Sequence, residues 1–371
     1  MTHPAETDLA ILENVPLGSR TTLHVGGPAR FYAEPRAVSA VQYGLLWARE
    51  RGIPIMVLGG GSNLLIADRG VSALVLRLRI TGIDVYTSPN AVHVTAGAGE
   101  RWEPFVAHAT SEGWAGVECL SGIPGDVGAT PIQNVGAYGQ EVADTIESVS
   151  AVDRETGEVV ELSAEKCAFS YRDSAFKGVL KDRHILTHVR FRLTPNGAPK
   201  IVYTELAKAL ADNKAPSIAD VRNTVLALRR SKSMVYDPAD PNHCSAGSFF
   251  TNPIVNDTTL AEVEKVAGPM LGAGQKFPKY PAGEGRTKLA AAWLIEHAGF
   301  TKGTSDGAVG LSTNHALAII NRGGATASQI VAFAIRIKRA VYNTFGVSLA
   351  VEPMLVGFDA DEIAELAAPI L

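Results

Sequence analysis

The chain has 371 residues, with 34 Lys and Arg against 38 Asp and Glu, and 46% of its residues are hydrophobic. This length predicts two or three domains, and a net charge of −4 excludes the basic surface by which proteins bind nucleic acids or anionic membranes. The three cysteines show no Cys-x-x-Cys spacing, so we expect reduced thiols, with neither a disulfide framework nor a metal site.

The stretch MTHPAETDLA lacks the regions of a signal peptide, and no apolar run approaches the ~18 residues of a membrane helix. We therefore expect a cytoplasmic protein with no membrane partner. We also expect a monomer, because no coiled-coil or strand interface is evident.

Apolar residues recur with helical spacing over residues 38–52, and this helix is expected to end at Gly52. A short buried strand follows at 53–58 and runs into a glycine turn. Alternating apolar residues predict antiparallel strands at 91–97, 148–163 (with a turn at 155–157) and 188–194.

Two later helices have clear start signals. A capping box at Ser217 predicts a helix at 218–231, and one at Thr326 predicts a helix at 327–345 that Gly346 ends. A strand-like stretch and a short acidic helix finish the chain. Because strands and helices are mixed and do not strictly alternate, the pattern favours an α+β fold over a doubly wound parallel sheet.

The first of two glycine-rich loops is LGGGSNLL, residues 58–65. It follows a predicted strand, where backbone amides without bulky side chains favour phosphate binding. It is not a Rossmann fingerprint, since Leu64 stands where the third glycine belongs, and it is not a P-loop, since the chain has no Gly-Lys pair. Alone, this loop is better explained as a tight turn in a buried strand pair.

The second loop, SGIPGDVGATPIQNVGAYG at residues 121–139, has no helix or strand period. A loop of this length inside a domain is usually functional, its glycines allow a ligand close to the backbone, and its prolines make the path rigid. It predicts a preformed cradle for the pyrophosphate of a dinucleotide that spans both loops. The alternative is a structural Ω-loop that packs on itself.

Ser248 lies in SAGSFFTNP, between a glycine and two phenylalanines. Neither G-x-S-x-G nor S-x-x-K surrounds it, and nothing in the sequence assigns His243, His297 or His315 to it as a base. From its surroundings alone, a turn serine bonded to its own backbone is the simpler interpretation.

Three further polar stretches are candidates. Arg172 in SYRDSAFK either binds a carboxylate or pairs with Asp173 at the surface. The cations of RRSK, residues 229–232, are explained by the C-terminal end of a helix. Glu352 precedes a proline in an apolar strand, where a carboxylate is either functional or held in a salt bridge.

Taken together, these stretches resemble one family. The segments TTLHVGGPA, VLGGGSNLL, LSGIPGDVGATPIQNVGAYG, FSYRDSAF, AGSFFTNP, KLAAAWLIEHAGF, LSTNHALAIINRGGAT and VEPML span about residues 20–357. Their order is similar to that of the MurB family, the UDP-N-acetylenolpyruvoylglucosamine reductases or UDP-N-acetylmuramate dehydrogenases, and to its longer, type I members.

The resemblance implies an FAD-binding fold of the vanillyl-alcohol-oxidase type with two subdomains, plus a C-terminal α+β substrate-binding domain. The implied segments are 1–79 and 80–231 for the two FAD-binding subdomains, 232–350 for the substrate-binding domain, and 351–371 for a C-terminal segment that returns to the FAD-binding region.

The resemblance also implies an activity in peptidoglycan synthesis. NADPH reduces non-covalently bound FAD, and hydride from flavin N5 then adds to the methylene carbon of UDP-N-acetylglucosamine enolpyruvate to give UDP-N-acetylmuramate. Arg172, Ser248 and Glu352 match the catalytic positions. Arg172 and Glu352 would face the developing enolate, and Ser248 would protonate the α-carbon, a role that needs no neighbouring base.

The remaining implied positions fall into two sets. Those for FAD are Gly59, Gly60, Gly61, Ser62, Asn63, Leu64, Gly122, Pro124, Gly125, Gly128, Ala129, Thr130, Gln133, Asn134, Gly136 and Ala137. Those for the substrate are Tyr138, Tyr171, Tyr203, Lys232, Asn252 and Lys288, with Tyr203 at the position of a tyrosine that closes over the diphosphate.

Two alternatives stay open. A related flavin oxidase of small alcohols or lactones would hold its flavin covalently through a histidine such as His24, which we interpret as a strand residue. A non-catalytic UDP-sugar or nucleotide binder would keep the fold without the chemistry. The presence of Arg172, Ser248 and Glu352 together argues against the second alternative.

Overall fold

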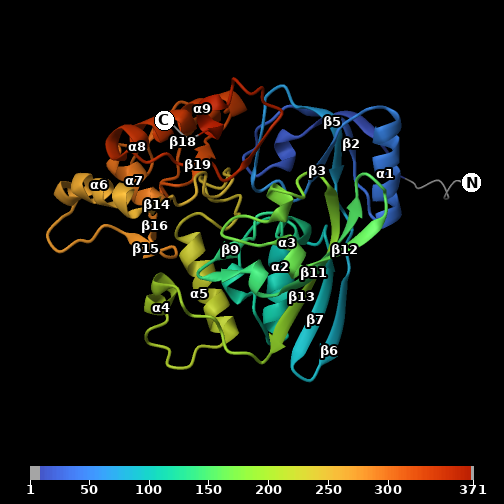
Figure 1. Cartoon of the computed structure of the whole chain (residues 1–371), viewed down its shortest axis with the longest axis horizontal. Helices are drawn as coiled ribbons and strands as arrows, with labels where there is room; N and C mark the ends of the chain where they lie inside the picture. The colour runs from blue at the N-terminus through green and yellow to red at the C-terminus, as the bar shows by residue number, and fades with distance from the viewer. Residues whose placement is uncertain (1–8, 369–371) are drawn as a thin grey trace, which may run out of the picture. The chain divides into compact units, whose positions relative to one another are not determined.

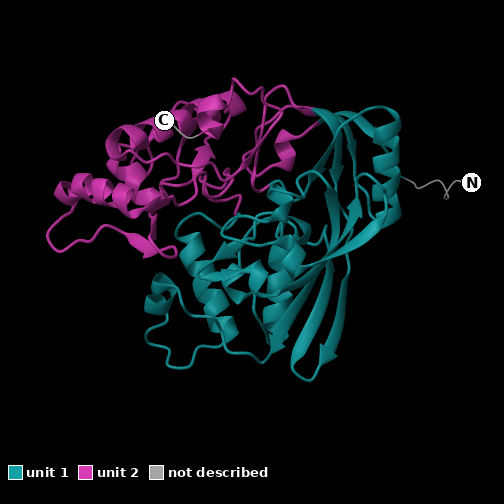
Figure 2. Cartoon of the chain, in the orientation of Figure 1, with its two compact units in different colours: residues 1–15, 29–61, 72–236 teal, residues 16–28, 62–71, 237–371 magenta. Residues whose placement is uncertain are grey.

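The computed structural model describes residues 9–368, and Figure 1 labels its elements. The N-terminal stretch MTHPAETDLA, in which we looked for a signal peptide, lies mostly outside these residues. The outer ends of the predicted segments 1–79 and 351–371 also lie outside them. Contacts within the chain divide it into two units, coloured separately in Figure 2. Unit 1 comprises residues 1–15, 29–61 and 72–236, and unit 2 comprises residues 16–28, 62–71 and 237–371.

Unit 1 contains most of the strands. In chain order its elements are β1 (Leu12–Pro16), β2 (Pro28–Ala33), α1 (Val38–Glu50), β3 (Ile55–Leu58), β5 (Val71–Arg77), β6 (Ile83–Ser88), β7 (Ala91–Gly97), α2 (Trp102–Ser111), β8 (Trp114–Ala115), β9 (Gly136–Ala137), β10 (Gln140–Glu141), β11 (Ile146–Asp153), β12 (Val159–Ser163), α3 (Ala164–Cys167), β13 (His184–Pro195), α4 (Thr204–Ala209) and α5 (Ile218–Arg230).

Two sheets build the core of unit 1. The first has the strand order β1-β2-β5-β3, and α1 packs on it through Val41 and Leu45. The second has the order β12-β11-β13-β7-β6 and is antiparallel, with β8 added to β13. Trp102 and Phe105 of α2 pack on its central strand against Phe191, at ring-centroid distances of 6.0 and 4.9 Å. Each sheet thus buries one face under a helix.

Unit 2 contains smaller sheets and, in α8, a helix of 19 residues. Its elements are β4 (Leu64–Ile66), β14 (Ile254–Asn256), α6 (Asp257–Ala267), β15 (Lys279–Pro281), β16 (Arg286–Leu289), α7 (Ala291–His297), β17 (Ser305–Asp306), β18 (Val309–Leu311), β19 (Ile319–Asn321), α8 (Ala327–Phe345), β20 (Met354–Val356) and α9 (Ala364–Ala367). The buried face of α8, with Ile330, Phe333 and Ile337, lies in one apolar core with Phe249 and Phe250. This core supports the segment that carries Ser248.

Most of the expected elements are confirmed. The predicted helix at 38–52 is α1, and the strand at 91–97 is β7. The stretch at 148–163 is the hairpin of β11 and β12. Ser217 and Thr326 form the capping boxes of α5 and α8, and Gly346 ends α8 in the left-handed conformation with a φ of 66°.

Two expectations were wrong. The strand-like stretch at 347–358 forms a strand only at β20, because its parallel partner β4 has three residues. His24 is not a strand residue: it lies in the loop after a 3-10 turn at Gly18–Arg20, with a φ of 53°, outside the range that a strand allows.

The predominance of antiparallel pairing confirms the α+β class. The predicted division into subdomains and a substrate-binding domain at residues 79, 231 and 350 stays a prediction. The contacts within the chain define two units and no subdomains within them. Within residues 9–368, no helix combines the length and the apolar composition needed to cross a membrane.

Candidate active site

The two glycine loops meet inside unit 1. A Cβ on Gly60 would lie 2.6 Å from Cα of Gly125, and one on Gly59 would lie 3.4 Å from Cβ of Ala129. Gly61 and Gly125 have φ values of 68° and 121°, which side chains other than glycine rarely allow. The glycines at 60 and 125 therefore serve the approach of one loop to the other, a role that the sequence did not reveal.

The second loop is fixed along its length. The N–H groups of Val127 and Gly128 donate to Glu100 and Ala98, and a Cβ on Gly128 would lie 2.4 Å from that of Ala98. Asn134 is buried, and its amide nitrogen donates to Glu141 and to the carbonyl of Ser170 at 2.7 and 3.0 Å. These bonds fix the loop, and Asn134 is one of the residues that hold it; the cradle for a pyrophosphate stays a prediction.

Buried polar atoms without partners lie beside the loops. Asp126 Oδ2 and Arg77 Nε are buried and have no hydrogen-bond partner among residues 9–368. Arg77 lies beside Leu58, the residue before Gly59, in the pairing of β5 with β3. Burial raises the pKa of the Asp126 carboxyl. Buried polar groups are normally satisfied, so unsatisfied ones at a glycine cradle fit a site for a polar ligand such as a dinucleotide.

Arg172 is held over the end of the second loop. It is a non-glycine residue with a φ of 55°, and its guanidinium donates to the carbonyl of Gly136 at 2.7 Å. A Cβ on Gly136 would lie 3.1 Å from the guanidinium nitrogen, so glycine makes room for this contact. The ring centroid of Tyr171 lies 5.5 Å from the guanidinium carbon. A residue held in the left-handed region is often functional.

Three of the predicted substrate residues also gather in unit 1. The rings of Tyr138 and Tyr203 meet edge to face with centroids 5.5 Å apart, and Tyr138 has a φ of 50°. Lys232 Nζ lies 2.7 and 2.6 Å from the carboxylate oxygens of Glu205, which follows Tyr203 in α4. Burial raises the pKa of Tyr138 to about 12, so its hydroxyl stays protonated at neutral pH. The structure thus connects Lys232, through Glu205, with the segment that carries Tyr203, whose ring contacts Tyr138. Tyr138, Tyr203 and Lys232 lie far apart in the sequence.

Arg229 is a candidate that the sequence reasoning missed, because we attributed its charge to the end of α5. Its side chain donates to Met234 at 2.6 Å and to Gly122 at 3.4 Å, while its buried Nε has no partner in the described part of the chain. Burial lowers its pKa to about 10, which still leaves it charged at neutral pH. The available signal was helical spacing: Arg229 follows buried Val225 by four residues and therefore shares its face.

In unit 2, Ser248 and Glu352 belong to one local structure. The N–H of Glu352 donates to the carbonyl of Phe249 at 3.0 Å, and Phe250 bridges Val351. Gly247, with a φ of 72°, provides the turn immediately before Ser248. The structure therefore places these two residues of the predicted catalytic set on neighbouring segments of the chain.

The end of the first loop joins the same structure. The side chain of Asn63 donates to the carbonyl of Glu352 at 3.3 Å, and the N–H of Met354 donates to the carbonyl of Asn63 at 3.0 Å. Leu64 is buried and begins β4, where it pairs with Met354. Thus, three segments distant in sequence converge around Glu352.

Asn252 and Lys288 lie further along unit 2. Asn252 Oδ1 accepts the N–H of Ala291 at 3.0 Å and so satisfies the first residue of α7. Lys288 is half-buried in β16, opposite Ile254 and Tyr280. Asn252 therefore has a structural role that its position in the sequence did not indicate.

The structure gives other partners to two histidines considered as bases for Ser248. His243 Nδ1 donates to the carbonyl of Asp240 at 2.6 Å, and its Nε2 lies 3.1 Å from the sulfur of Cys244. His297 Nδ1 lies 2.8 Å from the carbonyl of Trp293, on which its ring stacks. These contacts weaken the nucleophile interpretation of Ser248.

Comparisons with known proteins agree over most of the chain. A family model described as "FAD binding domain" matches residues 29–163, and one described as "UDP-N-acetylenolpyruvoylglucosamine reductase, C-terminal domain" matches residues 239–356. The UDP-N-acetylenolpyruvoylglucosamine reductase of Thermobifida fusca is 46% identical over 349 residues, which cover 93% of this chain and 97% of that protein. The protein of that name from Streptomyces avermitilis is 44% identical over 354 residues, covering 94% of this chain and 95% of that protein.

A solved structure gives the same result for the fold. The crystal structure of UDP-N-acetylenolpyruvylglucosamine reductase from Thermus caldophilus superposes with a TM-score of 0.63 at 24% identity. The match covers 94% of this chain and 98% of that one. Both predicted parts of the fold, the FAD-binding part and the C-terminal part, are thereby confirmed.

Proposed function

The chain belongs to the UDP-N-acetylenolpyruvoylglucosamine reductase family, and we propose that it reduces UDP-N-acetylglucosamine enolpyruvate to UDP-N-acetylmuramate with NADPH as the hydride donor. It is an FAD-dependent flavoprotein of peptidoglycan synthesis. The observation that carries the proposal is similarity over full length: the match with the Thermobifida fusca protein covers 97% of that protein at 46% identity. The chain therefore contains both the FAD-binding part and the C-terminal part that the proposed activity needs.

The residues of unit 1 fit a bound FAD. Gly59 to Gly61 and the second loop would hold its pyrophosphate. Asp126 Oδ2 and Arg77 Nε, which have no hydrogen-bond partner in the part of the chain that the structure describes, would find partners in a ligand of this polarity. Bound FAD would supply the hydride for the substrate's double bond. We propose that the other implied loop residues, Pro124, Thr130, Gln133 and Ala137 among them, line the same site.

Charge develops on the substrate when its double bond is reduced at the methylene carbon, because the electron pair moves to the α-carbon and its carboxylate. Preorganised donors stabilise such charge. Arg172 suits this task, since its contact with Gly136 fixes the guanidinium before a substrate arrives. Arg229, whose buried Nε has no hydrogen-bond partner within residues 9–368, would add positive charge for an anionic ligand of the same unit.

The substrate's diphosphate needs a binding group of its own. Lys232 would provide the cation, and its ion pair with Glu205 holds it near Tyr203 until then. We propose that Tyr203, which is 37% exposed, closes over the diphosphate. Tyr138, Tyr171, Asn252 and Lys288 would complete the substrate contacts.

The reaction ends with proton transfer to the α-carbon. We assign the donor role to Ser248, since a carbanion-like carbon is basic enough to take a proton from a positioned hydroxyl. The bond from Glu352 to the carbonyl of Phe249 holds Glu352 beside the serine's segment. In this role, Ser248 needs no activating histidine.

The two half-reactions test the proposal directly. Purified protein is mixed anaerobically with NADPH, the flavin absorbance is followed, and UDP-N-acetylglucosamine enolpyruvate is then added. We expect bleaching followed by prompt recovery of colour, and no recovery with UDP-N-acetylglucosamine, which lacks the enolpyruvyl group. Persistent bleaching with the enolpyruvyl substrate would contradict the proposed reaction, and a colourless protein that releases no flavin would favour a nucleotide binder.

A further inference from the structure

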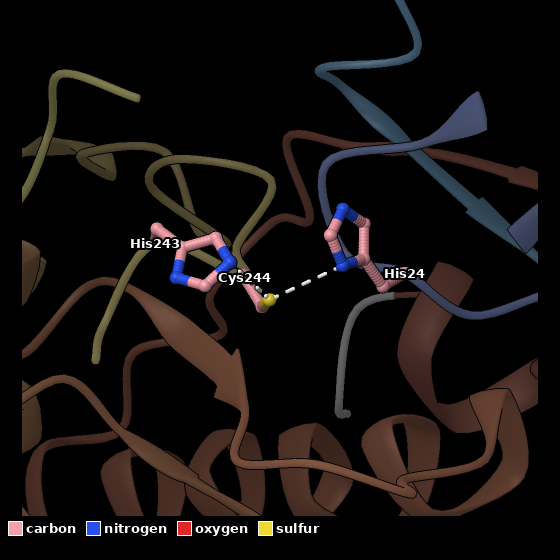
Figure 3. A group of neighbouring side chains, drawn as sticks. All are labelled: His24, His243 and Cys244. Carbon is pink, nitrogen blue, oxygen red and sulfur yellow. Dashed lines mark hydrogen bonds between the residues drawn. The ribbon is translucent and has the colours of Figure 1, made fainter. Parts of the chain in front are cut away.

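Unit 2 holds a cluster of metal-ligating side chains that the proposed function does not use. His24, His243 and Cys244 place one ligand atom each within 4.8 Å of one another. The Cys244 sulfur lies 3.4 Å from His24 Nδ1 and 3.1 Å from His243 Nε2, and Figure 3 shows the two imidazoles on either side of it. His24 is exposed, whereas the other two are half-buried. We propose that these three side chains bind a zinc ion.

The spacing of the ligand atoms fits zinc. Bonds of about 2.3 Å to sulfur and about 2.0–2.1 Å to nitrogen, at a tetrahedral angle, separate sulfur from nitrogen by about 3.5 Å. The two sulfur–nitrogen distances, 3.1 and 3.4 Å, lie close to this value. Little rearrangement is therefore needed for one ion to contact all three atoms.

The hydrogen bonding of the His243 ring also fits. Its Nδ1 lies 2.6 Å from the carbonyl oxygen of Asp240, and a carbonyl only accepts, so Nδ1 carries the proton. The lone pair of the neutral imidazole is then on Nε2, which faces Cys244. A metal-ligating histidine commonly donates its other N–H to a carbonyl in this way, which orients the ring and strengthens it as a ligand.

Asn321 joins the two segments that bring the ligands together. Its side-chain amide donates to the carbonyls of Leu23 and His24 at 3.0 and 3.4 Å, and its backbone N–H donates to the carbonyl of Cys244 at 2.9 Å. Asn321 is itself buried. The ligands are thus preorganised by bonds that do not depend on a metal, which lowers the cost of binding one.

The chemistry of the set selects the ion. One thiolate and two imidazoles suit zinc, and three protein ligands leave a fourth position for water, which the exposure of His24 allows. Binding replaces the thiol proton of Cys244, so one proton is released as the sulfur–zinc bond forms. No oxidation or reduction is involved.

Cobalt(II) provides the spectroscopic probe, because it occupies tetrahedral zinc sites. Titration of the flavin-containing protein with Co²⁺, followed by difference spectroscopy, is expected to give a thiolate-to-cobalt charge-transfer band that saturates at one equivalent and is abolished by Zn²⁺. Cys244→Ser should lose the band, and His24→Ala should weaken binding by at least about tenfold. His108→Ala, at an exposed histidine of α2, is the matched control and should bind as the parent does. Binding without a thiolate band, or a band that survives Cys244→Ser, overturns the proposal.

A second measurement needs no variant. Cys119 and Cys167 are fully buried, which leaves Cys244 as the thiol that iodoacetamide reaches in the folded protein. Alkylation of the Cys244 peptide, followed by mass spectrometry, should slow by at least about tenfold with Zn²⁺ and recover with a chelator. An unchanged alkylation rate at saturating Zn²⁺ would overturn the proposal and leave the cluster as a hydrogen-bonded group of side chains only.

Discussion

The side-chain amide of Asn63 donates a 3.3 Å hydrogen bond to the backbone carbonyl of Glu352, a residue 289 positions later in the chain. The return bond runs from the N–H of Met354 to the carbonyl of Asn63 at 3.0 Å. A residue of the first glycine loop therefore fixes the backbone on which Glu352 is carried. Since Glu352 also bonds to Phe249, the position of Ser248 depends on the same structure.

Asn63→Ala should reduce catalysis by misplacing Glu352. The lost hydrogen bond is worth about 1 kcal/mol, so we expect stability to fall by about that amount and flavin reoxidation by substrate to slow about fivefold. Stopped-flow absorbance and urea unfolding measure the two effects. Asn256→Ala removes a similar bond, the cap of α6 to Thr259, and serves as the control. If both variants slow reoxidation equally, the Asn63 bond has no positioning role.

Ser248→Ala should separate the two half-reactions. Without the proton donor, reoxidation of the flavin by substrate is expected to fall by at least about 100-fold, while bleaching by NADPH stays nearly intact. Ser245→Ala, which removes the hydroxyl that accepts from the N–H of Gly247 at 3.3 Å, is the control and should have a much smaller effect. Equal slowing of both half-reactions by Ser248→Ala would show that the serine is structural.

Two neighbouring glycines should respond differently to alanine. A methyl group at Gly60 would lie 2.6 Å from Cα of Gly125, so Gly60→Ala is expected to destabilise the protein by about 1–3 kcal/mol and to lower its flavin content. At Gly59 the nearest atom would be 3.4 Å away, an ordinary contact, and thermal stability should be nearly unchanged. Thermal unfolding and the ratio of flavin to protein absorbance measure these effects. Equal melting temperatures for the two variants would contradict the loop-to-loop role of Gly60.

Acid stability should depend on Asp153, at the turn of the β11–β12 hairpin. Its carboxylate accepts the N–H groups of Thr156 and Glu155 and the Arg183 guanidinium, and these bonds, that of Thr156 first, lower its pKa from 3.8 to about 2. The folded state thus favours the charged carboxylate. Its contribution to stability is fully present above the unfolded pKa and is lost as the pH falls through about 2.

Asp153→Asn tests this contribution. The variant should unfold at a lower urea concentration than the parent at about pH 5, and the difference should shrink as the pH approaches about 2. Asp212→Asn, at an exposed aspartate after α4, is the control and should leave the urea midpoint nearly unchanged. A difference between Asp153→Asn and the parent that is independent of pH would exclude the charged carboxylate as its source.

Local signals in the sequence predicted the secondary structure well, because they act over a few residues. The capping boxes at Ser217 and Thr326 and the left-handed Gly346 concern neighbouring backbone groups, and all three are confirmed. The glycine loops and the order of the motifs were enough to identify the family and its FAD-binding fold. The prediction that His24 is a strand residue was wrong. Its backbone has the left-handed conformation, and an alternating pattern of apolar residues does not indicate such a conformation.

Only the tertiary structure decided which residues meet. Cys244 and His24 are 220 positions apart, so the absence of a Cys-x-x-Cys pair gave no information on the cluster that they form with His243. The same holds for Asn63 with Glu352, for Gly60 with Gly125, and for the buried Nε of Arg229. The sequence by itself determined most of the helices and strands, the family, and the types of reactive side chain that are present, since these depend on residue type and short spacing. The folded chain determined the partners of each side chain, because burial and hydrogen bonding between distant segments depend on how sheets and helices pack.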